Sequence, residues 1–309
     1  MKVYHSIEEF PSEINTIITI GTFDGVHKGH KQVIKKLNNI AKKQGFESVL
    51  LTLFPHPRHV LYPDDQQLKL LNTIDEKIEE LKKSGLQHFV VHKFTKEFSR
   101  TKSVNFIRDL LVNKLKMKHM VVGYNHHFGR NREGSYNDLK ELAELYNFEL
   151  ERIPSQNEGD VTISSTKVRE LLLAGDVEKA TIYLGYSYPI NGKVVRGNAR
   201  GRTIGFPTAN ILVENKWKLI PADGVYAVKV KLGGKQFYGM LNMGERPTLS
   251  DNEHRIEVHI FDFSSDIYGT DIKVEFVKRI REEKQFDNLE LLRKQLQIDE
   301  NNCKKFFRI

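Results

Sequence analysis

The chain has 309 residues, of which 39% are hydrophobic and 28% charged, and its 48 basic and 40 acidic residues give a formal charge of +8. This length predicts about two domains, and this composition is typical of a soluble globular protein. A membrane protein, a disulfide scaffold and a disordered chain are excluded, because no apolar run approaches the roughly 18 residues of a membrane span and Cys303 is the only cysteine. Residues Met1–Pro11 contain no apolar signal core, so we expect a cytoplasmic protein without a secretory signal.

Short β-rich runs alternate with helical patterns in the first half of the chain. In chain order, these strands and helices are Ile17–Ile20, Lys31–Lys43, Ser48–Phe54, Ile74–Lys83, Phe89–His92, Val104–Lys114, His119–Gly123, Ser135–Tyr146 and Phe148–Ile153. Strands separated by helices of this length favour βαβ units and a parallel sheet. We therefore expect a Rossmann-like α/β domain, whose ligands bind at the carboxyl ends of the strands.

Turn residues rather than helices separate the predicted strands after Ser187. These strands are Val225–Leu232, Phe237–Leu241, Ile256–Phe263 and Ile272–Val277, and a helix is predicted over Asn288–Leu296. A run of strands joined by turns predicts an antiparallel β-barrel with a terminal helix. We therefore expect an α/β domain at residues 1–184 and an all-β domain at residues 185–309.

The segment from Gly21 to His30 has the sequence GTFDGVHKGH and joins a predicted strand to a predicted helix. Its glycines allow the backbone to approach a phosphate closely, and the N-terminus of the following helix attracts anions. His27 and His30 are three residues apart and share a helix face, from which they can donate hydrogen bonds to a polyphosphate. A plain turn and a histidine metal pair are the alternatives, although no third metal ligand accompanies the pair.

Three hydroxyl residues, Ser164, Ser165 and Thr166, precede another predicted helix, and Arg169 lies in its first turn. One hydroxyl is enough to cap a helix, so three together favour a phosphate site on which Arg169 forms a forked contact. A surface arginine on a capped helix is the alternative. Asn125 follows a predicted strand, at the place where the sites of α/β sheets are built.

Glycines alternate with cations between Gly192 and Ile211. This pattern favours a flexible flap over a polyphosphate, and a basic surface loop is the alternative. Thr208 and Asn210 share one face of an extended segment and offer oxygen ligands of the kind that Mg²⁺ prefers. Glu257 lies in a predicted strand, where it is either a general base or a solvated glutamate.

The first motif resembles the signature of the nucleotidyltransferase superfamily, and its Phe-Asp-Gly-Val-His version resembles the bacterial bifunctional riboflavin kinase/FMN adenylyltransferase (FAD synthetase) family. The stretches Phe54–Arg58, Val122–Gly129 and Ile163–Arg169 resemble the same family. The resemblance implies catalytic roles for four residues, His27, His30, Asn125 and Arg169. It implies ATP binding by Gly21, Thr22, Phe23, Asp24, Gly25, Gly29, Ser164, Ser165 and Thr166.

The second motif resembles the riboflavin kinase domain of this family, in which a Pro-Thr-Ala-Asn segment binds Mg-ATP. The resemblance implies that Thr208 and Asn210 hold Mg²⁺ and that Glu257 is the catalytic base. It implies flavin binding by Arg281 and Phe286. The ATP-binding residues that it implies here are Gly192, Lys193, Arg202, Thr203, Gly205 and Pro207.

These features predict two consecutive transfers to a flavin. The barrel is expected to phosphorylate riboflavin with ATP, giving FMN, and the N-terminal domain is expected to transfer AMP from ATP to FMN, giving FAD and pyrophosphate. Small molecules are thus the expected partners, and the sequence allows an oligomer. One alternative is another nucleotidyltransferase with a barrel that only binds, which leaves Thr208, Asn210 and Glu257 without a purpose. The other is a nucleic-acid-binding module, which the spread of positive charge over both halves disfavours.

Overall fold

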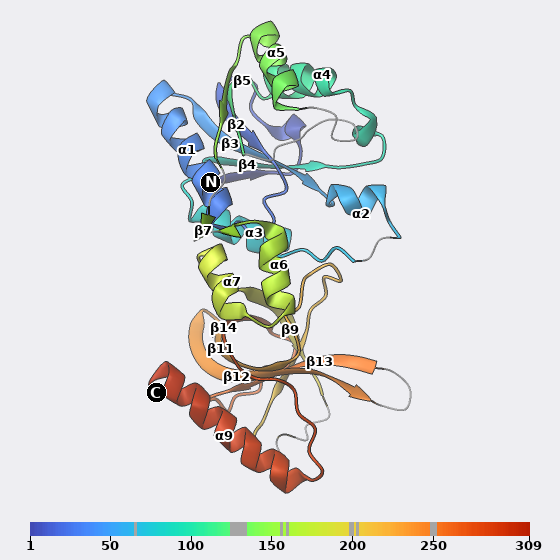
Figure 1. Cartoon of the computed structure of the whole chain (residues 1–309), viewed down its shortest axis with the longest axis vertical. Coiled ribbons are helices and arrows are strands. Elements are labelled where there is room, and N and C mark those ends of the chain that lie inside the picture. The colour runs from blue at the N-terminus through green and yellow to red at the C-terminus, as the bar shows by residue number, and fades with distance from the viewer. Residues whose placement is uncertain are drawn as a thin grey trace. The chain divides into compact units, whose positions relative to one another are not determined.

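The computed structural model describes residues 1–64, 67–123, 135–154, 157–158, 161–197, 201, 204–247 and 252–309. It divides into two compact units, Met1–Ser165 and Thr166–Ile309. A parallel sheet forms the centre of the first unit and a closed antiparallel barrel forms the centre of the second (Figure 1). The predicted combination of an α/β and an all-β domain is therefore confirmed.

Six parallel strands make up the sheet of the N-terminal unit, in the order β1-β4-β3-β2-β5-β6. They are β1 (Lys2–Tyr4), β2 (Thr16–Ile20), β3 (Glu47–Phe54), β4 (His88–Lys93), β5 (Met117–Val122) and β6 (Glu149–Arg152). The chain proceeds from β2 outward through β3 to β4 and returns on the other side of β2 as β5. The strand order thus reverses between β2 and β5, and ligands of open α/β sheets bind at such a reversal.

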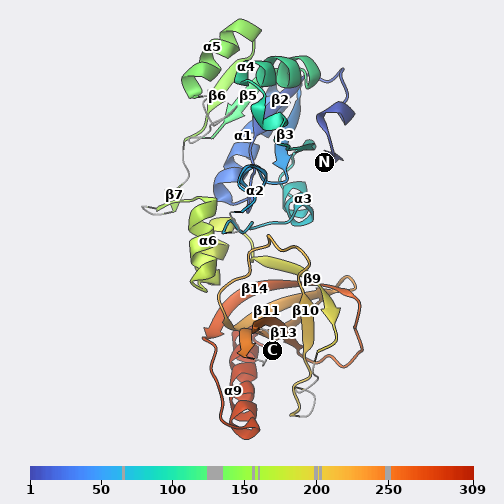
Figure 2. The ribbon, with the colours of Figure 1, turned by 90° about the vertical axis from the view of Figure 1, so that its right-hand side faces the viewer.

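Helices cover both faces of this sheet, because alternate residues of each strand point to opposite sides (Figure 2). Ile17 packs with α1 and α3 in one core, whereas its neighbour Ile18 packs with the helices of the opposite face. The helices are α1 (Lys28–Gln44) and α3 (Ile74–Lys82) on one face, and α4 (Ser103–Asn105), its π-helical continuation η3 (Phe106–Lys114) and α5 (Tyr136–Tyr146) on the other. Smaller elements are η1 (Ile7–Glu9), α2 (Pro57–Leu61), η2 (Phe98–Arg100), β7 (Asn157–Glu158) and β8 (Val161–Thr162).

The barrel of the C-terminal unit closes in the order β10-β13-β12-β11-β14-β9. Its strands are β9 (Pro189–Val195), β10 (Ala209–Leu212), β11 (Gly224–Leu232), β12 (Lys235–Pro247), β13 (Asn252–Ile260) and β14 (Asp271–Arg281). The four strands predicted from the sequence are all present as β11 to β14. The strands β9 and β10 were not predicted, and they close the barrel by pairing with each other, for example at Val195 and Asn210. The ends of the predicted flap therefore belong to the barrel wall.

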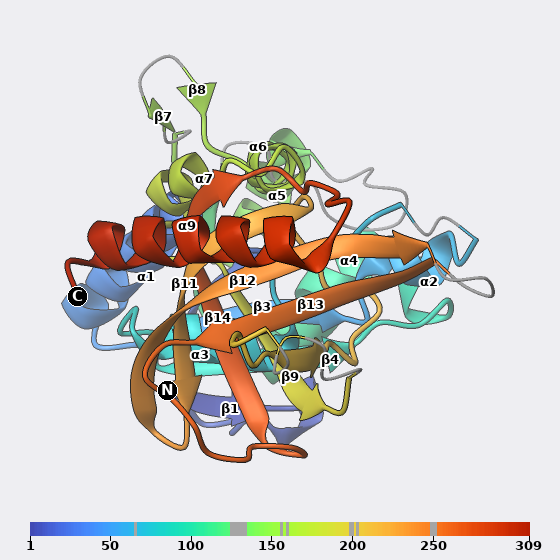
Figure 3. The same cartoon turned by 90° about the horizontal axis from the view of Figure 1, so that it is seen from below.

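The helices that accompany the barrel in the described ranges include α6 (Ser165–Leu173), α7 (Val177–Leu184) and α9 (Leu289–Phe307). The helix α7 packs against β14, and α9 lies across β11 and β12 (Figure 3). Cys303 of α9 is fully buried in the core that this helix shares with the barrel. Nearly all of α6 and all of α7 group with the barrel, whereas the sequence places the domain boundary after residue 184, and that boundary stays a prediction.

Candidate active sites

The loop that follows β2 turns sharply before α1 begins. Gly25 has a φ of +84°, in the left-handed region that favours glycine, and Phe23 and Val26 are held at φ values of +45° and +37°. Non-glycine residues at positive φ are strained and persist where their surroundings fix them, commonly at functional sites. Because β2 pairs with β5, this loop lies at the reversal point of the sheet, where the topology places a ligand.

The imidazole of His27 caps the N-terminus of α1. Its Nδ1 accepts a hydrogen bond of 3.3 Å from the backbone amide of His30. The rings of His27 and His30 stack with their centroids 3.6 Å apart, and the ring of Phe23 stacks against His30 at 4.5 Å. The predicted placement of the two histidines on one helix face is confirmed.

Electrostatics at this helix end favour an anion. Burial lowers the pKa of His30 well below 6.5, and the positive charges of His27 and Lys77 act in the same direction. His30 is therefore a neutral imidazole at neutral pH, and its Nδ1 is buried without a hydrogen-bond partner among the described residues. The first turn of α1 carries no acidic side chain. A helix N-terminus with this surrounding is suited to bind a polyphosphate.

Asp24 and Ser165, both predicted to bind ATP, are brought together in the structure. The hydroxyl of Ser165 donates a hydrogen bond of 2.8 Å to the backbone carbonyl of Asp24. The carboxylate of Asp24 is buried and accepts hydrogen bonds of 3.0–3.2 Å from the backbone amides of Leu71 and Asn72. This carboxylate therefore holds the loop to the segment that precedes α3.

Other residues predicted for this site belong to several elements. Gly21 begins the loop, where its amide donates to the carbonyl of Leu51, and Gly29 lies in the first turn of α1. Thr166 and Arg169 belong to α6 and thus to the C-terminal unit. Asn125 lies outside the described residues. The part of the predicted site that the structure assembles is therefore the loop, the histidine pair and Ser165.

Strand register assembles the centre of the barrel site. Asn210 of β10 and Glu257 of β13 are direct partners in an antiparallel pair, so their side chains share one face of the sheet. The hydroxyl of Thr208 donates a hydrogen bond of 3.2 Å to a carboxylate oxygen of Glu257. A Cβ atom on Gly197 would overlap the side-chain amide of Asn210, so a larger residue there would displace this amide. The structure thus brings together the three residues that the sequence assigned to metal binding and proton transfer.

His259 fixes the backbone beside this cluster. Its ring Nδ1 is 2.7 Å from the carbonyl oxygen of Pro207, and its ring makes an edge contact with Phe206 at 5.5 Å. Glu257 and His259 are two residues apart on β13 and share its outward face, whereas the intervening Val258 is buried. One strand therefore carries the candidate base and also holds the segment that contains Thr208.

Arg281 and Phe286, the predicted flavin-binding pair, are in contact. The guanidinium carbon of Arg281 is 5.8 Å from the centroid of the Phe286 ring. The guanidinium also donates hydrogen bonds of 2.8–3.1 Å to both carboxylate oxygens of Asp299 on α9. Asp299 is buried and accepts a further bond of 2.9 Å from Gln295. The terminal helix therefore sets the position of Arg281.

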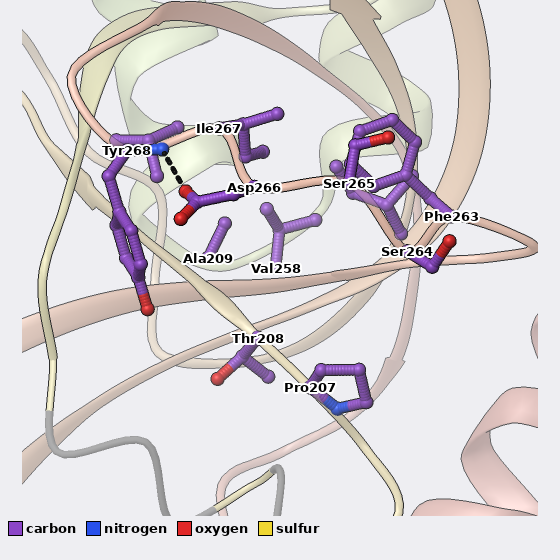
Figure 4. Close-up of a pocket in the computed structure, with 12 residues that line it drawn as sticks. Pro207, Thr208, Ala209, Val258, Phe263, Ser264, Ser265, Asp266, Ile267 and Tyr268 are labelled. Atoms are coloured by element: carbon purple, nitrogen blue, oxygen red, sulfur yellow. Dashed lines mark hydrogen bonds between the residues drawn. The ribbon is translucent and has the colours of Figure 1, made fainter.

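A pocket of about 290 Å³ lies next to Thr208. Pro207 and Thr208 line one side, and the loop that contains Asp266 and Tyr268 lines the other (Figure 4). Asp266 accepts a hydrogen bond of 3.0 Å from the backbone amide of Tyr268, which orders this loop. The volume is at the lower end of the range for small-molecule sites. The pocket can therefore receive a group of the size of a planar base.

The remaining residues predicted for ATP binding in the barrel lie on β9, in the segment before Phe206, or outside the described residues. Gly192 and Lys193 lie in β9, and Lys193 is exposed. Gly205 has a φ of +88° and precedes the Phe206–Thr208 segment. Arg202 and Thr203 lie outside the described residues.

Two buried charged residues beside these sites were missed by the sequence reasoning. Lys77 contacts the loop after β2, and Asp299 contacts Arg281. Each lies on the apolar stripe of its helix, Lys77 between Ile74 and Leu81 and Asp299 four residues before Cys303. A charge at such a position is a signal for a paired, buried group.

The chain belongs to the class of transferases, because each of its two units matches a family of group-transfer enzymes. The family model described as FAD synthetase matches residues 10–167, and the one described as riboflavin kinase matches residues 184–307. The chain belongs to the bifunctional riboflavin kinase/FMN adenylyltransferase family.

Curated relatives carry both parts on one chain. A Listeria monocytogenes protein named bifunctional riboflavin kinase/FMN adenylyltransferase is 38% identical over 96% of this chain and 94% of its own length. Proteins of the same name from Escherichia coli strain K12 and Bacillus subtilis are 36% and 34% identical, and each match covers 98% of this chain and 96% of the relative. This near-complete coverage extends the family assignment over both units.

A solved structure has the same fold over nearly the whole chain. It is a crystal structure of a Streptococcus pneumoniae protein described as a macrolide-efflux protein, with a TM-score of 0.89 and 32% identity over 98% of both chains. Within the described ranges of the present chain, no helix has the length and apolar character needed to cross a membrane.

Proposed function

We propose that the chain makes FMN from riboflavin in its barrel and FAD from FMN in its N-terminal unit, with ATP as the donor in both steps. The observation that carries this proposal is the cluster of Thr208, Asn210 and Glu257, which the strand register places on one face. A barrel that only binds its ligand has no need for a carboxylate, an amide and a hydroxyl in this arrangement. The loop after β2, with His27 and His30 stacked at the N-terminus of α1, supports FAD formation in the N-terminal unit.

In the kinase reaction, Glu257 is the general base. Its carboxylate accepts the proton of the ribityl 5′-hydroxyl as that oxygen attacks the γ-phosphorus of ATP, and the bond to the β-phosphate oxygen breaks to release ADP. The hydroxyl of Thr208 donates a hydrogen bond to Glu257, so its oxygen lone pairs remain available to a cation. Thr208 and Asn210 fit Mg²⁺ because they offer neutral oxygen ligands beside phosphates. When bound, Mg²⁺ would neutralise charge on the phosphates.

The pocket beside Thr208 suits the base of this ATP. It opens next to the segment that would hold the phosphates, and its walls include apolar groups such as Val194 and Val258 together with the polar loop of Asp266. Apolar walls with a few polar groups are usual for small-molecule sites. Arg281 and Phe286 would then contact the flavin, with the guanidinium held in place by Asp299.

In the adenylyltransferase reaction, a phosphate oxygen of FMN attacks the α-phosphorus of the second ATP. The bond from this phosphorus to the bridging oxygen breaks, and pyrophosphate leaves. His27 and His30 would hydrogen-bond to the departing pyrophosphate at the N-terminus of α1, where the helix dipole also favours negative charge. Positioning and electrostatics suffice for this step, because no covalent intermediate forms.

The first experiment incubates the purified chain with riboflavin, ATP and Mg²⁺ and separates the flavins by chromatography. We expect FMN to form first and FAD to follow, and the absence of both products would refute the proposal. Omission of Mg²⁺ with a chelator present should stop FMN formation. A filter-binding assay at low salt tests the nucleic-acid alternative, and we expect that the protein retains no nucleic acid on the filter.

Both reactions use ATP, so we place the protein in the cytoplasm.

Two substitutions separate the activities. Asn210→Ala should abolish FMN formation and leave the conversion of FMN to FAD unchanged, because it removes a ligand of the barrel site alone. His27→Ala should do the reverse. His27→Asn is the matched control, because asparagine keeps the helix cap that alanine loses, at about 1 kcal/mol. Equal loss of FAD formation in both His27 variants would assign the effect to the imidazole, whereas full activity of His27→Asn would assign it to the cap.

A further inference from the structure

Lys77 occupies a position on α3 where an apolar side chain is expected. It lies three residues after Ile74 and four before Leu81, and only 7% of it is exposed to solvent. A buried ammonium group is strongly unfavourable unless its charge and protons are matched by nearby groups. The groups that accept its hydrogen bond and balance its charge therefore show which segment Lys77 positions.

The partners of Lys77 belong to the loop that carries the histidines. Its Nζ donates a hydrogen bond of 2.6 Å to the backbone carbonyl of Thr22. Burial lowers the pKa of Lys77, and the buried carboxylate of Asp24 opposes that shift by attraction. Asp24 in turn accepts the amides of Leu71 and Asn72. One cation and one anion thus tie the loop to the segment from residue 71 to residue 77.

The same loop sets the geometry of the histidine pair. Thr22 directly precedes Phe23, whose ring stacks against His30, and the loop then runs through Asp24 to the cap residue His27. A displacement of the Thr22 carbonyl therefore moves the stacking partner of His30 and the start of α1. The charged groups that act on His30 are His27 from its own helix and Lys77 from α3.

We propose that Lys77 is a positioning residue for the transferase reaction of the N-terminal unit, where its ammonium group holds the Thr22 carbonyl and thereby fixes the loop that leads into α1. This inference rests on the proposed role of His27 and His30 in FAD formation. Lys77 does not touch the reacting atoms in this assignment. Its charge has a second effect, because it helps to keep His30 neutral.

The test compares Lys77→Met, Lys77→Gln and Lys77→Arg in the full chain, and the kinase activity of the barrel serves as an internal control. We expect Lys77→Met to lower the turnover of FMN to FAD by about 10- to 100-fold, as misplaced catalytic groups do, with FMN formation from riboflavin unchanged. Lys82→Met is the matched control, because Lys82 is exposed on the same helix, and it should leave both activities unchanged.

The pH profile distinguishes positioning from a merely structural role. The rate of FAD formation should fall at acidic pH as His30 takes up a proton, and we call this fall the acid limb of the pH profile. Lys77 lowers the pKa of His30, so the loss of Lys77 should move the acid limb to higher pH. Lys77→Gln can still donate to Thr22 but lacks the charge, so it should recover part of the rate and keep the shifted limb. Lys77→Arg keeps the charge and should return the limb toward its wild-type position.

Three results would overturn the inference. One is a wild-type rate in folded Lys77→Met, and another is a reduced rate with an acid limb that does not move in any variant. The third is failure of all three Lys77 variants to fold, which would assign Lys77 to stability alone. Absence of FAD formation by the wild-type chain is a different result, because it would refute the proposed function itself.

Discussion

The two units build their candidate sites by different means. In the N-terminal unit the site is a loop at the end of β2, and its shape depends on buried contacts with a distant segment, such as those of Asp24 with Leu71 and Asn72. In the barrel the site is a set of side chains on neighbouring strands, and its shape depends on backbone register, which places Asn210 opposite Glu257.

This difference determines how each site responds to substitution. A loop has no ladder of hydrogen bonds, so removal of one bracing group can displace several site residues together. A strand register is held by many backbone bonds, so a single side chain can be removed there with little displacement of its neighbours. Substitutions in the barrel should therefore affect chemistry with little effect on the fold, except where the terminal helix is involved.

The largest expected effect is on the chemistry of the barrel. Glu257→Gln keeps the size of the side chain and its place on β13 but removes the base, so FMN formation should fall by about 10²- to 10⁴-fold. FAD formation from supplied FMN should not change. Rates of both reactions, measured by flavin chromatography, check this outcome. A variant that keeps more than a tenth of the kinase rate would contradict the assignment of Glu257 as the base.

A smaller effect is expected where the terminal helix meets the barrel. Asp299→Ala leaves the guanidinium of Arg281 without its acid partner, and Arg281 has only 20% of its side chain in solvent. We expect a loss of about 2–3 kcal/mol in the free energy of unfolding of the barrel, less than for a fully buried pair. The KM for riboflavin should also rise. Urea unfolding and steady-state kinetics measure the two effects.

Glu300→Ala is the matched control for this prediction. Glu300 is adjacent in sequence and pairs with Lys304 one helical turn away, and such pairs contribute about 0.5 kcal/mol or less. Equal destabilisation by Asp299→Ala and Glu300→Ala would show that the contact of Asp299 with Arg281 stabilises the barrel no more than an ordinary ion pair on the helix.

The smallest effect expected is on the pH dependence of stability. Burial lowers the pKa values of His30, His92 and His119 in the N-terminal unit. These histidines stay neutral in the folded state at a pH where the unfolded chain binds protons. Stability of this unit should therefore fall as the pH falls below about 6.5.

In the barrel, the groups with shifted pKa values affect stability at alkaline pH. Burial raises the pKa values of Tyr226 and Cys303 to about 12, above their ordinary values of 10.0 and 9.0. The folded barrel keeps protons that the unfolded chain releases, so its stability should fall above about pH 9. Calorimetry at pH 5.5, 7 and 9.5, with Asp299→Ala used to identify the barrel transition, tests both signs. A barrel transition that falls first on acidification would refute them.

Local patterns were enough to predict the elements that carry most of both sites. The spacing of Val33, Ile34, Leu37 and Ala41 predicted α1, and these residues are buried. The alternation around Thr208 and Asn210 predicted a shared face, which the pairing with Glu257 confirms. In these cases the information lies within one helix or strand, where periodicity reports directly on burial.

The features that were missed depend on contacts between distant segments. The strands β9 and β10 become strands by closing the barrel, and Lys77 acquires its role from a carbonyl 55 residues away. Asp299 likewise meets Arg281 only after α9 has docked on the barrel. Loop closure and long-range register are set by the whole fold, so periodicity within a short segment does not determine them.

The burial of Cys303 gives this protein a built-in reporter of motion. It is the only thiol of the chain, it is fully buried on the face of α9 that packs against the barrel, and its raised pKa keeps it protonated and unreactive. A thiol reagent can label it only when the terminal helix detaches from the barrel. The labelling rate of the unmodified protein thus measures the free energy of this local opening, without any engineered probe.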